Sequence, residues 1–431
     1  MLLRQPLREA DATRTFYVLT GVVAFCLALC FTLNLVFQFR VIGLDPFQMV
    51  LVGTTLELTC FLFEVPTGIV ADLYSRRLSV IIGFALIGVG FAVEGIVATF
   101  AAAVIGNVVW GIGYTFTSGA LQAWITDEVG EDRMERVFTR ETQIDLGFTI
   151  VGTLAAGALG LVSLRTPVVA AGAGLLLLAV GLLLFMPERN FAPTPRGDRE
   201  SFAHMRAQFV AGLDVARHRS LVRVFLLVSL LVGLSSEAFD RLWRVRILEE
   251  FPMPAVFGGD EAVAFTVFAL IGTTLSLVAS LTGSRWLSPR LVAERPGLPV
   301  AVAALLQVGA LVGVALLGNL WLALAAVWLR SAAMAFSRPI EATWLNRNLD
   351  SGTRATVLSM TGQADAIGQV SGGPPLGALA ARTTIPVALL VSAGIQLPTV
   401  AAFLRVRRVP APPETEHRPG LIDEGPNVRT T

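Results

Sequence analysis

The chain has 431 residues, of which 54% are hydrophobic and 15% are charged, and its formal net charge is +1. A soluble domain carries about 25% charged residues, so this composition predicts a membrane protein, and the near-neutral charge argues against nucleic acid as a partner. All 33 basic residues are arginine, and the absence of lysine excludes a Walker A loop, a Schiff-base lysine and a Ser-Lys hydrolase. No histidine lies in an apolar run, so HExxH zinc chemistry is not expected either. We expect a protein that is not an enzyme and has neither a cofactor nor a metal site.

Apolar stretches of about 20 residues, the length that crosses a bilayer, recur along the chain. The first follows Arg4, Arg8 and Arg14 but has no small-residue cleavage site, which favours a membrane span over a signal peptide. The predicted fold is an all-α membrane protein with 12 transmembrane helices in two six-helix bundles. The predicted spans are 16–38, 47–71, 78–99, 101–125, 138–162, 166–186, 221–246, 261–283, 298–317, 319–342, 355–381 and 385–404.

The arginines predict the orientation of these spans. With both termini inside, the cytoplasmic loops and tails hold 25 arginines, whereas the opposite loops and helix ends hold 6. Arginine-rich loops remain cytoplasmic. We therefore expect a multi-pass protein of the plasma (inner) membrane with both termini in the cytoplasm.

The longest break in hydropathy divides the chain in the middle. It predicts an N-terminal bundle over 1–186, a cytoplasmic linker over 187–220, a C-terminal bundle over 221–405 and a disordered cytoplasmic tail over 406–431. Within the linker, Phe202, Met205, Phe209 and Leu213 have helical spacing. This pattern fits an amphipathic helix in the membrane interface or a soluble helix packed on its own bundle.

An internal repeat supports the division into two halves. Trp124 precedes Gln143 by 19 positions, with Asp145 two residues further on, and Trp344 precedes Gln363 and Asp365 at the same offsets. The two sets fall on the fourth and fifth predicted spans and on the tenth and eleventh. Matching spacing on corresponding spans indicates duplication.

Ionisable residues inside spans are costly, at about 2.5–3.5 kcal/mol, and usually face a cavity or a partner. Asp145, Asp365 and Arg330 lie at similar depths in different spans, and Glu57 also lies near the midplane. We predict that Asp145, Asp365 or Glu57 carries a proton. The alternative is a fixed ion pair between Arg330 and Asp365. The residues expected to line a substrate cavity are Arg330, Gln143, Gln363 and Asn34.

Three further groups of residues have local patterns. Glu94, close to the outer end of the third span, is expected to be solvated. Glu237, Asp240 and Arg241 make the outer half of the seventh span polar, which fits a solvated helix end or an outer gate facing the first span. Glycines at 147, 152, 157 and 160 predict a close helix neighbour for the fifth span, and the Gly-Gly-Pro-Pro at 372–375 predicts a kink in the eleventh.

The turn between the second and third spans carries the clearest motif. Its spacing, Gly68-x-x-x-Asp72-x-x-x-Arg76-Arg77, resembles the loop between helices two and three of the major facilitator superfamily. The likeness covers 15–405, and Glu64-Val-Pro-Thr-Gly68 and the fourth-span end at Asp127 are similar to bacterial drug-efflux members. In this loop Leu73 and Ser75 replace the usual basic residue and glycine. The residues that the resemblance assigns to a cytoplasmic gate are Glu64, Gly68, Asp72, Arg76, Arg77 and Asp127.

The resemblance implies that Gly68 allows close helix approach, and that Arg76 bridges Asp72 and Asp127 in the outward-facing form. It also implies a monomeric secondary transporter with a small-molecule substrate, a proton as coupling ion and a lipid bilayer around it. The fifth span lacks the Gly-Pro signature of antiporters, and the fourth has Asn107 and Trp110-Gly111 in place of the usual arginine motif. The few charges in the spans favour efflux of a hydrophobic molecule or drug. The alternative is uptake of a polar or anionic metabolite whose carboxylate binds Arg330.

Overall fold

The computed structural model describes residues 5–191, 217–286, 295–349 and 351–405, and all regular structure within these ranges is helical. The linker helix predicted around 202–213 and the predicted tail over 406–431 lie outside the described residues.

The N-terminal half supplies six membrane-length segments, one of which is broken into two helices. Its helices are α1 (Gln5–Phe37), followed by a π-helical turn η1 (Gln38–Ile42), α2 (Pro46–Leu73), α3 (Arg76–Val97), α4 (Phe100–Thr117), α5 (Ala120–Val129), α6 (Met134–Gly160) and α7 (Arg165–Phe185). A 3₁₀ turn, η2 (Glu131–Arg133), joins α5 to α6.

The C-terminal half repeats this plan. Its helices are α9 (Ser220–Glu250), α10 (Glu261–Trp286), α12 (Gly297–Leu316), α13 (Leu320–Arg347), α14 (Ser351–Arg382), α15 (Ile385–Gln396) and α16 (Pro398–Arg405). Eleven segments of the described chain are long and apolar enough to cross a membrane. The 32-residue α14 is not among them. It is long enough to cross, and its interior carries Gln363, Asp365 and Gln369, so α14 completes the twelve predicted spans.

Side chains at the turns explain where several helices begin. The side chains of Asp45, Ser75, Thr99 and Thr384 each accept a hydrogen bond from a backbone N–H three residues later, and Asp45 forms a capping box with Gln48. Such caps satisfy the free N–H groups of the first helical turn and typically stabilise a helix by about 1 kcal/mol. They fix short turns between membrane-length helices.

Two spans that the hydropathy predicts as single helices are broken. The fourth span divides into α4 and α5 at Ser118 and Gly119, and Gly119 has φ +72°. A side chain is strained in this region of backbone space, whereas glycine is not. The last span divides into α15 and α16 at Leu397, just before Pro398.

The helices of the two halves pair in the same order. In the N-terminal half, α1 packs on α6 and α7, α3 packs on α4 and α7, and α2 packs on α4. The corresponding helices of the C-terminal half make the corresponding pairs: α9 with α14 and α15, α12 with α13 and α15, and α10 with α13. The repeat in the sequence is therefore matched by a repeat in helix packing.

The two repeated tryptophans are both buried at the ends of their bundles. Trp124 donates a hydrogen bond from Nε1 to the carbonyl of Pro187, just after the last helix of its half. In the C-terminal half, the ring of Trp344 packs at a tilt against that of Phe403 in the last helix, with the ring centroids 6.3 Å apart. Each tryptophan thus ties the fourth segment of its half to the end of the sixth.

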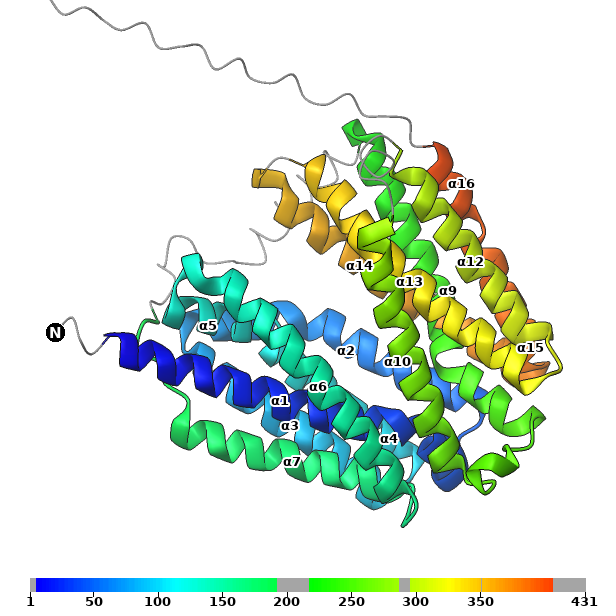
Figure 1. Ribbon diagram of the computed structural model, residues 1–431, viewed down its shortest axis with the longest axis horizontal. Helices are drawn as coiled ribbons and strands as arrows, with labels where there is room; N and C mark the ends of the chain where they lie inside the picture. The colour runs from blue at the N-terminus through cyan, green and yellow to red at the C-terminus, as the bar shows by residue number, and fades with distance from the viewer. Residues whose placement is uncertain (1–4, 192–216, 287–294, 350, 406–431) are drawn as a thin grey trace, which may run out of the picture.

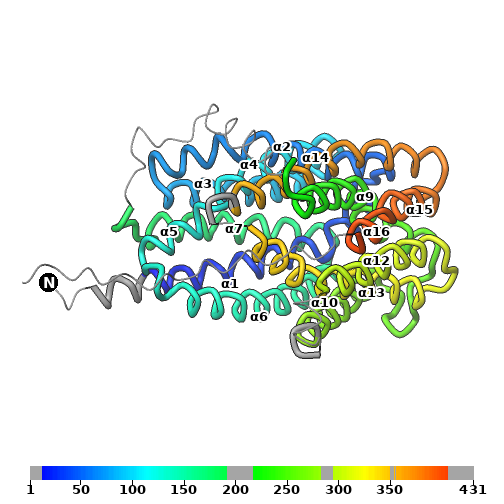
Figure 2. The backbone as a smooth tube through the Cα atoms, turned by 90° about the horizontal axis from the view of Figure 1, so that it is seen from above, coloured from blue at the N-terminus to red at the C-terminus, as the bar shows by residue number. Residues whose placement is uncertain are grey.

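The two halves meet at one side of the molecule and separate toward the other. Figure 1 shows α1–α7 as one group of helices and α9–α16 as the second, and Figure 2 shows α14 running alongside α2 where the halves meet. We call the side where α1 begins and α16 ends the terminal side, and the opposite side the far side. The halves touch mainly through α2 with α14 and α9, and through α6 and α1 with α10.

Glycines allow this close contact on the far side. A Cβ at Gly157 of α6 would lie 2.6–3.1 Å from side-chain atoms of Thr266 on α10, and one at Gly377 of α14 would lie 2.9 Å from Cβ of Val50 on α2. The expectation of a close neighbour for the fifth span is confirmed. An ion pair of 2.7 Å between Arg40 and Glu261 also joins the halves here.

Candidate functional site

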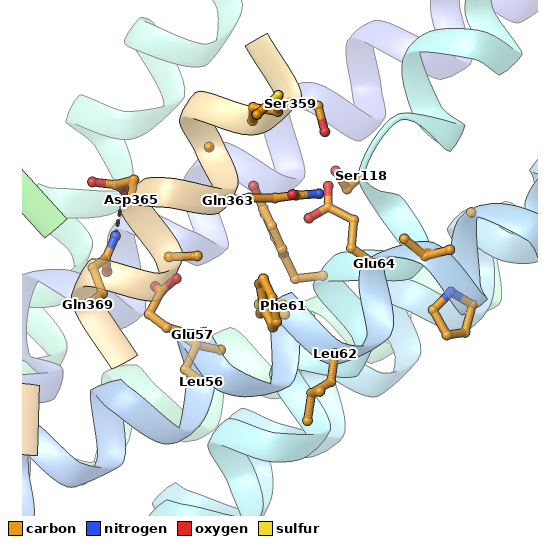
Figure 3. Close-up of a pocket in the computed structure, with 18 of the residues that line it drawn as sticks. Leu56, Glu57, Phe61, Leu62, Glu64, Ser118, Ser359, Gln363, Asp365 and Gln369 are labelled. Atoms are coloured by element: carbon orange, nitrogen blue, oxygen red, sulfur yellow. Dashed lines mark hydrogen bonds between the residues drawn. The ribbon is translucent and has the colours of Figure 1, made fainter. Parts of the chain in front are cut away.

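A cavity of about 1050 Å³ lies between α2 and α4 of the N-terminal half and α14 of the other half (Figure 3). Its deep part is lined by Glu57, Asp365 and Gln369, and its mouth by Asp72, Ser118 and Thr356. Asp72 ends α2 and Thr356 lies near the start of α14. The cavity therefore opens to the terminal side, where the two halves separate.

The cavity lining is acidic. Its carboxylates are Glu57, Glu64, Asp72 and Asp365, and none of the lining residues in the described chain is basic. Arginines lie behind this lining: Arg76 is 3.6 Å from Asp72, and Arg241 and Arg338 act through space on Glu57 and Asp365. Carboxylates in a partly desolvated space nevertheless attract protons and cations when no basic side chain reaches the space itself.

The deepest carboxylates come from opposite halves. Asp365 Oδ2 accepts a hydrogen bond of 2.7 Å from Nε2 of Gln369, one turn further along α14. Figure 3 shows this pair, with Glu57 on the neighbouring α2. Glu57 interacts electrostatically with Asp365 and also with Asp240 and Arg241 of α9. A charge placed between α2 and α14 therefore interacts electrostatically with residues of both halves.

The cavity walls are otherwise apolar and aromatic. Phe61, Trp110 and Tyr114 belong to the lining, together with Leu56, Leu358 and Met360. Aromatic faces attract cations as well as apolar groups. The walls and the carboxylates together suit a molecule with both an apolar body and a positive charge.

Beside the cavity mouth, Arg76 connects the turn after α2 with the broken fourth span. Its guanidinium pairs with Asp127 of α5 and lies 3.6 Å from Asp72. Gly68 lines the mouth, and a Cβ placed there would meet no atom within 4 Å. In this state, then, no helix packs closely on Gly68.

Ser75 takes part in a second set of contacts at the same turn. With φ −174° it is extended, its Oγ accepts from the N–H of Leu78, and it donates to Oε2 of Glu188 at 2.6 Å. Oε1 of Glu188 accepts from the N–H of Arg77 at 2.8 Å. Glu128 of α5 likewise accepts from the N–H groups of Arg189 and Asn190. The segment 187–190 is thereby fixed beside the turn between α2 and α3.

Replacing Glu188 by glutamine is expected to destabilise this turn by about 1–2 kcal/mol, because two charge-assisted hydrogen bonds become weaker ones. In a thermal unfolding scan of the purified protein, the midpoint should fall by a few degrees. The exposed Glu131→Gln is the matched control and should leave the midpoint unchanged. An equal midpoint for both variants would refute the role assigned to Glu188.

Of the residues expected at the outer gate, Glu237 and Arg241 lie where α9 meets α2, whereas Asp240 is exposed and lies near Arg330 of α13. Glu237 is 4% exposed, and its carboxylate is 3.6 Å from Nε of Arg241. A Cβ at Gly53 of α2 would overlap both of these side chains. The expectation of a solvated helix end is therefore wrong for Glu237, because α2 covers it. The two residues face the second span here, whereas the sequence suggested the first.

Arg330 does not line the cavity. It is 4% exposed, its guanidinium lies 4.1 Å above the ring of Phe239, and Nη1 is 3.6 Å from Asp240. The ion pair between Arg330 and Asp365 that was the alternative interpretation is absent from the described structure, since Asp365 binds Gln369. The rotation of α13 directs Arg330 toward α9.

Of the other residues predicted for the cavity or for proton transfer, some line the cavity and others lie elsewhere. Gln363 and Asp365 line the cavity, whereas their repeat partners Gln143 and Asp145 are exposed on α6 and are not part of the lining. Gln143 accepts a hydrogen bond from Arg140 at 2.9 Å. Asn34 is 5% exposed and lies in a separate buried cluster.

That cluster surrounds Glu94, for which the expectation of solvation is wrong. Glu94 is 3% exposed, and its carboxylate accepts hydrogen bonds from the side-chain amides of Asn34, Gln38 and Asn107. The sequence contains one signal for this site, since Asn34 and Gln38 are spaced i, i+4 on one helix face. Their meeting with α3 and α4 depends on helix packing.

Three comparisons place the chain among known proteins. The model of the Major Facilitator Superfamily matches residues 16–373. The chain is 23% identical over 367 residues to the uncharacterized MFS-type transporter YxaM of Bacillus subtilis (strain 168), covering 85% of this chain and 88% of that protein.

Solved structures show the same fold. The nucleoside transporter NupG superposes with a TM-score of 0.74 at 14% identity, covering 91% of this chain and 98% of that one. A bacterial homologue of the human lysosomal transporter Spinster, in an inward-facing and unoccupied conformation, gives a TM-score of 0.68 at 15% identity, covering 94% and 99%.

Proposed function

The chain belongs to the Major Facilitator Superfamily, and from this premise we propose that it is a secondary transporter that works by alternating access and exports hydrophobic cations in exchange for protons. The fold supports alternating access, because two helix bundles meet on one side of a cavity and separate on the other. The proposal places the protein in the plasma (inner) membrane.

We assign the terminal side to the cytoplasm, because arginine-rich loops remain on that side of a membrane. The described state then faces inward, and the bridge from Arg76 to Asp72 and Asp127 is present in it, whereas the resemblance assigned that bridge to the outward-facing form. An inward-facing cavity is the state in which an exporter takes up its substrate. The Arg40–Glu261 pair and the glycine contacts of the far side would separate when the cavity opens outward.

The acidic lining of the cavity is the main support for a cationic, partly apolar substrate. Four carboxylates line it without a basic lining residue in the described chain, and aromatic side chains complete the wall. A positively charged molecule with an apolar body gains from both features, whereas an anion would be repelled.

The same carboxylates explain how exchange would be coupled. A proton and a cationic substrate neutralise the same negative charges at Glu57 and Asp365, so the binding of one disfavours the other. If each half-cycle requires these charges to be neutralised, the substrate leaves as protons enter.

Uptake of an anion through Arg330 has less support. Arg330 already interacts with Asp240 and Phe239 and does not belong to the cavity lining. The names of the nucleoside transporter and of the Spinster homologue describe those proteins, and their low identity carries only the fold to this chain.

The decisive experiment uses inside-out vesicles with an imposed, acid-inside pH gradient reported by a dye. Addition of a lipophilic cation should dissipate the gradient in the wild type. In Asp365→Asn or Glu57→Gln, the response should fall by roughly tenfold or more, because an amide cannot carry the proton.

The repeat gives a matched control for this experiment. Asp145→Asn removes the corresponding carboxylate of α6, outside the cavity lining, and should retain the response. An equal loss in Asp145→Asn and Asp365→Asn would refute the assignment of the carriers. Accumulation of a labelled anion that depends on Arg330, with no response to any cation, would replace export by uptake.

A further inference from the structure

A second polar site lies in the N-terminal half, apart from the cavity. Glu94 of α3 accepts hydrogen bonds at Oε1 from Asn34 Nδ2 at 3.0 Å and from Gln38 Nε2 at 2.7 Å, and at Oε2 from Asn107 Nδ2 at 3.4 Å. Asn107 also donates to the carbonyl of Ala103. The four side chains come from α1 with its π-helical turn and from the packed pair α3 and α4, all in the N-terminal group of Figure 1.

The site contains a buried carboxylate without an ion-pair partner. Each of the four side chains is at most 5% exposed. Within the described residues no arginine forms an ion pair with Glu94. Arg241 of α9 acts on it only through space and pairs instead with Glu237. A buried charge of this kind costs several kcal/mol unless another charge neutralises it.

An aromatic layer separates this site from the cavity. The rings of Phe31, Phe91 and Trp110 pack against one another in tilted and edge-to-face pairs, with ring centroids 5.1–5.7 Å apart. Each is three residues from a member of the polar cluster on the same helix: Phe31 from Asn34, Phe91 from Glu94 and Trp110 from Asn107. The chain direction of α4 is opposite to that of α1 and α3. In all three helices the polar residue therefore lies on the far side of its aromatic residue.

Trp110 connects the two sites. It lines the cavity on one side and belongs to the aromatic layer that adjoins the Glu94 cluster on the other. A small ion in the open cavity is therefore separated from Glu94 by one layer of side chains. A change in the rotamer of Trp110 would provide a path.

The cluster contains the oxygen atoms that a cation requires. Oε1 of Gln38 is buried and has no hydrogen-bond partner. The amide groups of Asn34, Gln38 and Asn107 can each exchange oxygen for nitrogen by rotating about the terminal bond, with little change in shape. Together with the carboxylate, they would then offer five oxygens around one point.

We propose that Glu94, Asn34, Gln38 and Asn107 form a binding site for a sodium ion. Hard cations prefer oxygen ligands, and a single carboxylate with neutral amides is neutralised by a monovalent ion, whereas a divalent ion would leave excess charge in the bundle. A proton on Glu94 would leave the buried Oε1 of Gln38 still without a partner, whereas a cation can bind it. This site is independent of the proposed exchange of cations for protons in the cavity.

The test measures binding of sodium to the purified full-length protein at fixed pH. Thermal unfolding midpoints are compared in sodium chloride and in choline chloride of equal ionic strength. In the wild type the midpoint should rise saturably with sodium, by about 3 °C or more at saturation. Binding of radioactive sodium should be saturable and close to one ion per chain.

The variants localise the effect. Glu94→Gln should abolish both signals, whereas Glu57→Gln, which removes a cavity carboxylate beyond the aromatic layer, should retain them. If Glu94→Gln does not fold, Asn107→Leu keeps the carboxylate and should weaken sodium binding by about tenfold through loss of one ligand.

Two results would overturn the proposal. One is an equal midpoint in sodium and choline together with no saturable binding of sodium by the wild type. For the other, the comparison of the two salts is repeated at several pH values: stabilisation that follows pH alone and is equal in both salts would identify the bound species as a proton. Neither result bears on the vesicle assay, because that assay can be run without sodium.

Discussion

Gly157→Val is expected to shift the protein away from the described state, in which the far side is closed and the terminal side is open. A Cβ at Gly157 would lie 2.6–3.1 Å from side-chain atoms of Thr266, across the contact between α6 and α10 that joins the two halves. Overpacking of this kind costs about 1–3 kcal/mol, and here the cost falls only on states in which the far side is closed. The population of this state should fall by roughly 5- to 150-fold relative to the alternative.

Pulsed electron paramagnetic resonance can measure this shift. Spin labels at Tyr74, after α2, and at Arg347, at the end of α13, report the distance across the terminal side in a cysteine-free background. Both positions are exposed. The distance distribution should move to shorter values in Gly157→Val. The control Gly394→Val adds the same side chain where a Cβ meets no atom within 4 Å. An unchanged distribution in Gly157→Val would show that this contact persists throughout the cycle.

Gly68→Leu is expected to have the opposite effect. Gly68 lies at the open mouth of the cavity, and a Cβ there meets no atom within 4 Å, so a side chain at this position can extend into the open mouth in the described state. The resemblance of the loop motif implies close helix approach at this glycine when the terminal side closes. Transport should therefore fall by at least about tenfold, while the protein folds and retains substrate binding.

The same pair of spin labels distinguishes blocked closure from misfolding. In Gly68→Leu the long distance should remain, and addition of a lipophilic cation should no longer shorten it. Combining Gly68→Leu with Gly157→Val should destabilise the protein more than either change alone, because both states are then overpacked. Normal transport by Gly68→Leu would mean that no helix approaches this position.

Hydropathy predicts most of the fold because bilayer thickness imposes a strong length requirement on apolar segments. The predicted span 47–71 corresponds to α2 over Pro46–Leu73, and 78–99 corresponds to α3 over Arg76–Val97. The break at Gly119 is not visible in hydropathy, because it lies inside one membrane-length apolar stretch. Its local signal is the pair Ser118-Gly119, a dipeptide typical of turns, but many glycines in this chain lie inside helices.

The site is predicted less completely, because its residues depend on helix rotation. Glu57, Gln363 and Asp365 lie in the cavity, whereas Arg330 faces α9 and Asp145 is exposed. Asp145 and Asp365 have the same place in the repeat, so the sequence cannot distinguish them. Their difference arises from which helix faces the cavity in this state.

The broken fourth span has a consequence for how the protein responds to its lipids. The 18 residues of α4 extend about 27 Å, which already approaches the thickness of the hydrocarbon layer. The ten residues of α5, with Trp124 and Asp127, continue beyond the break at Gly119. A thicker or thinner bilayer would change the tilt of α4, and the backbone at Gly119 would bend so that α5 keeps its place. Activity should therefore tolerate a change in acyl-chain length better than a continuous helix would allow, because the joint prevents hydrophobic mismatch from straining the pair of Arg76 and Asp127.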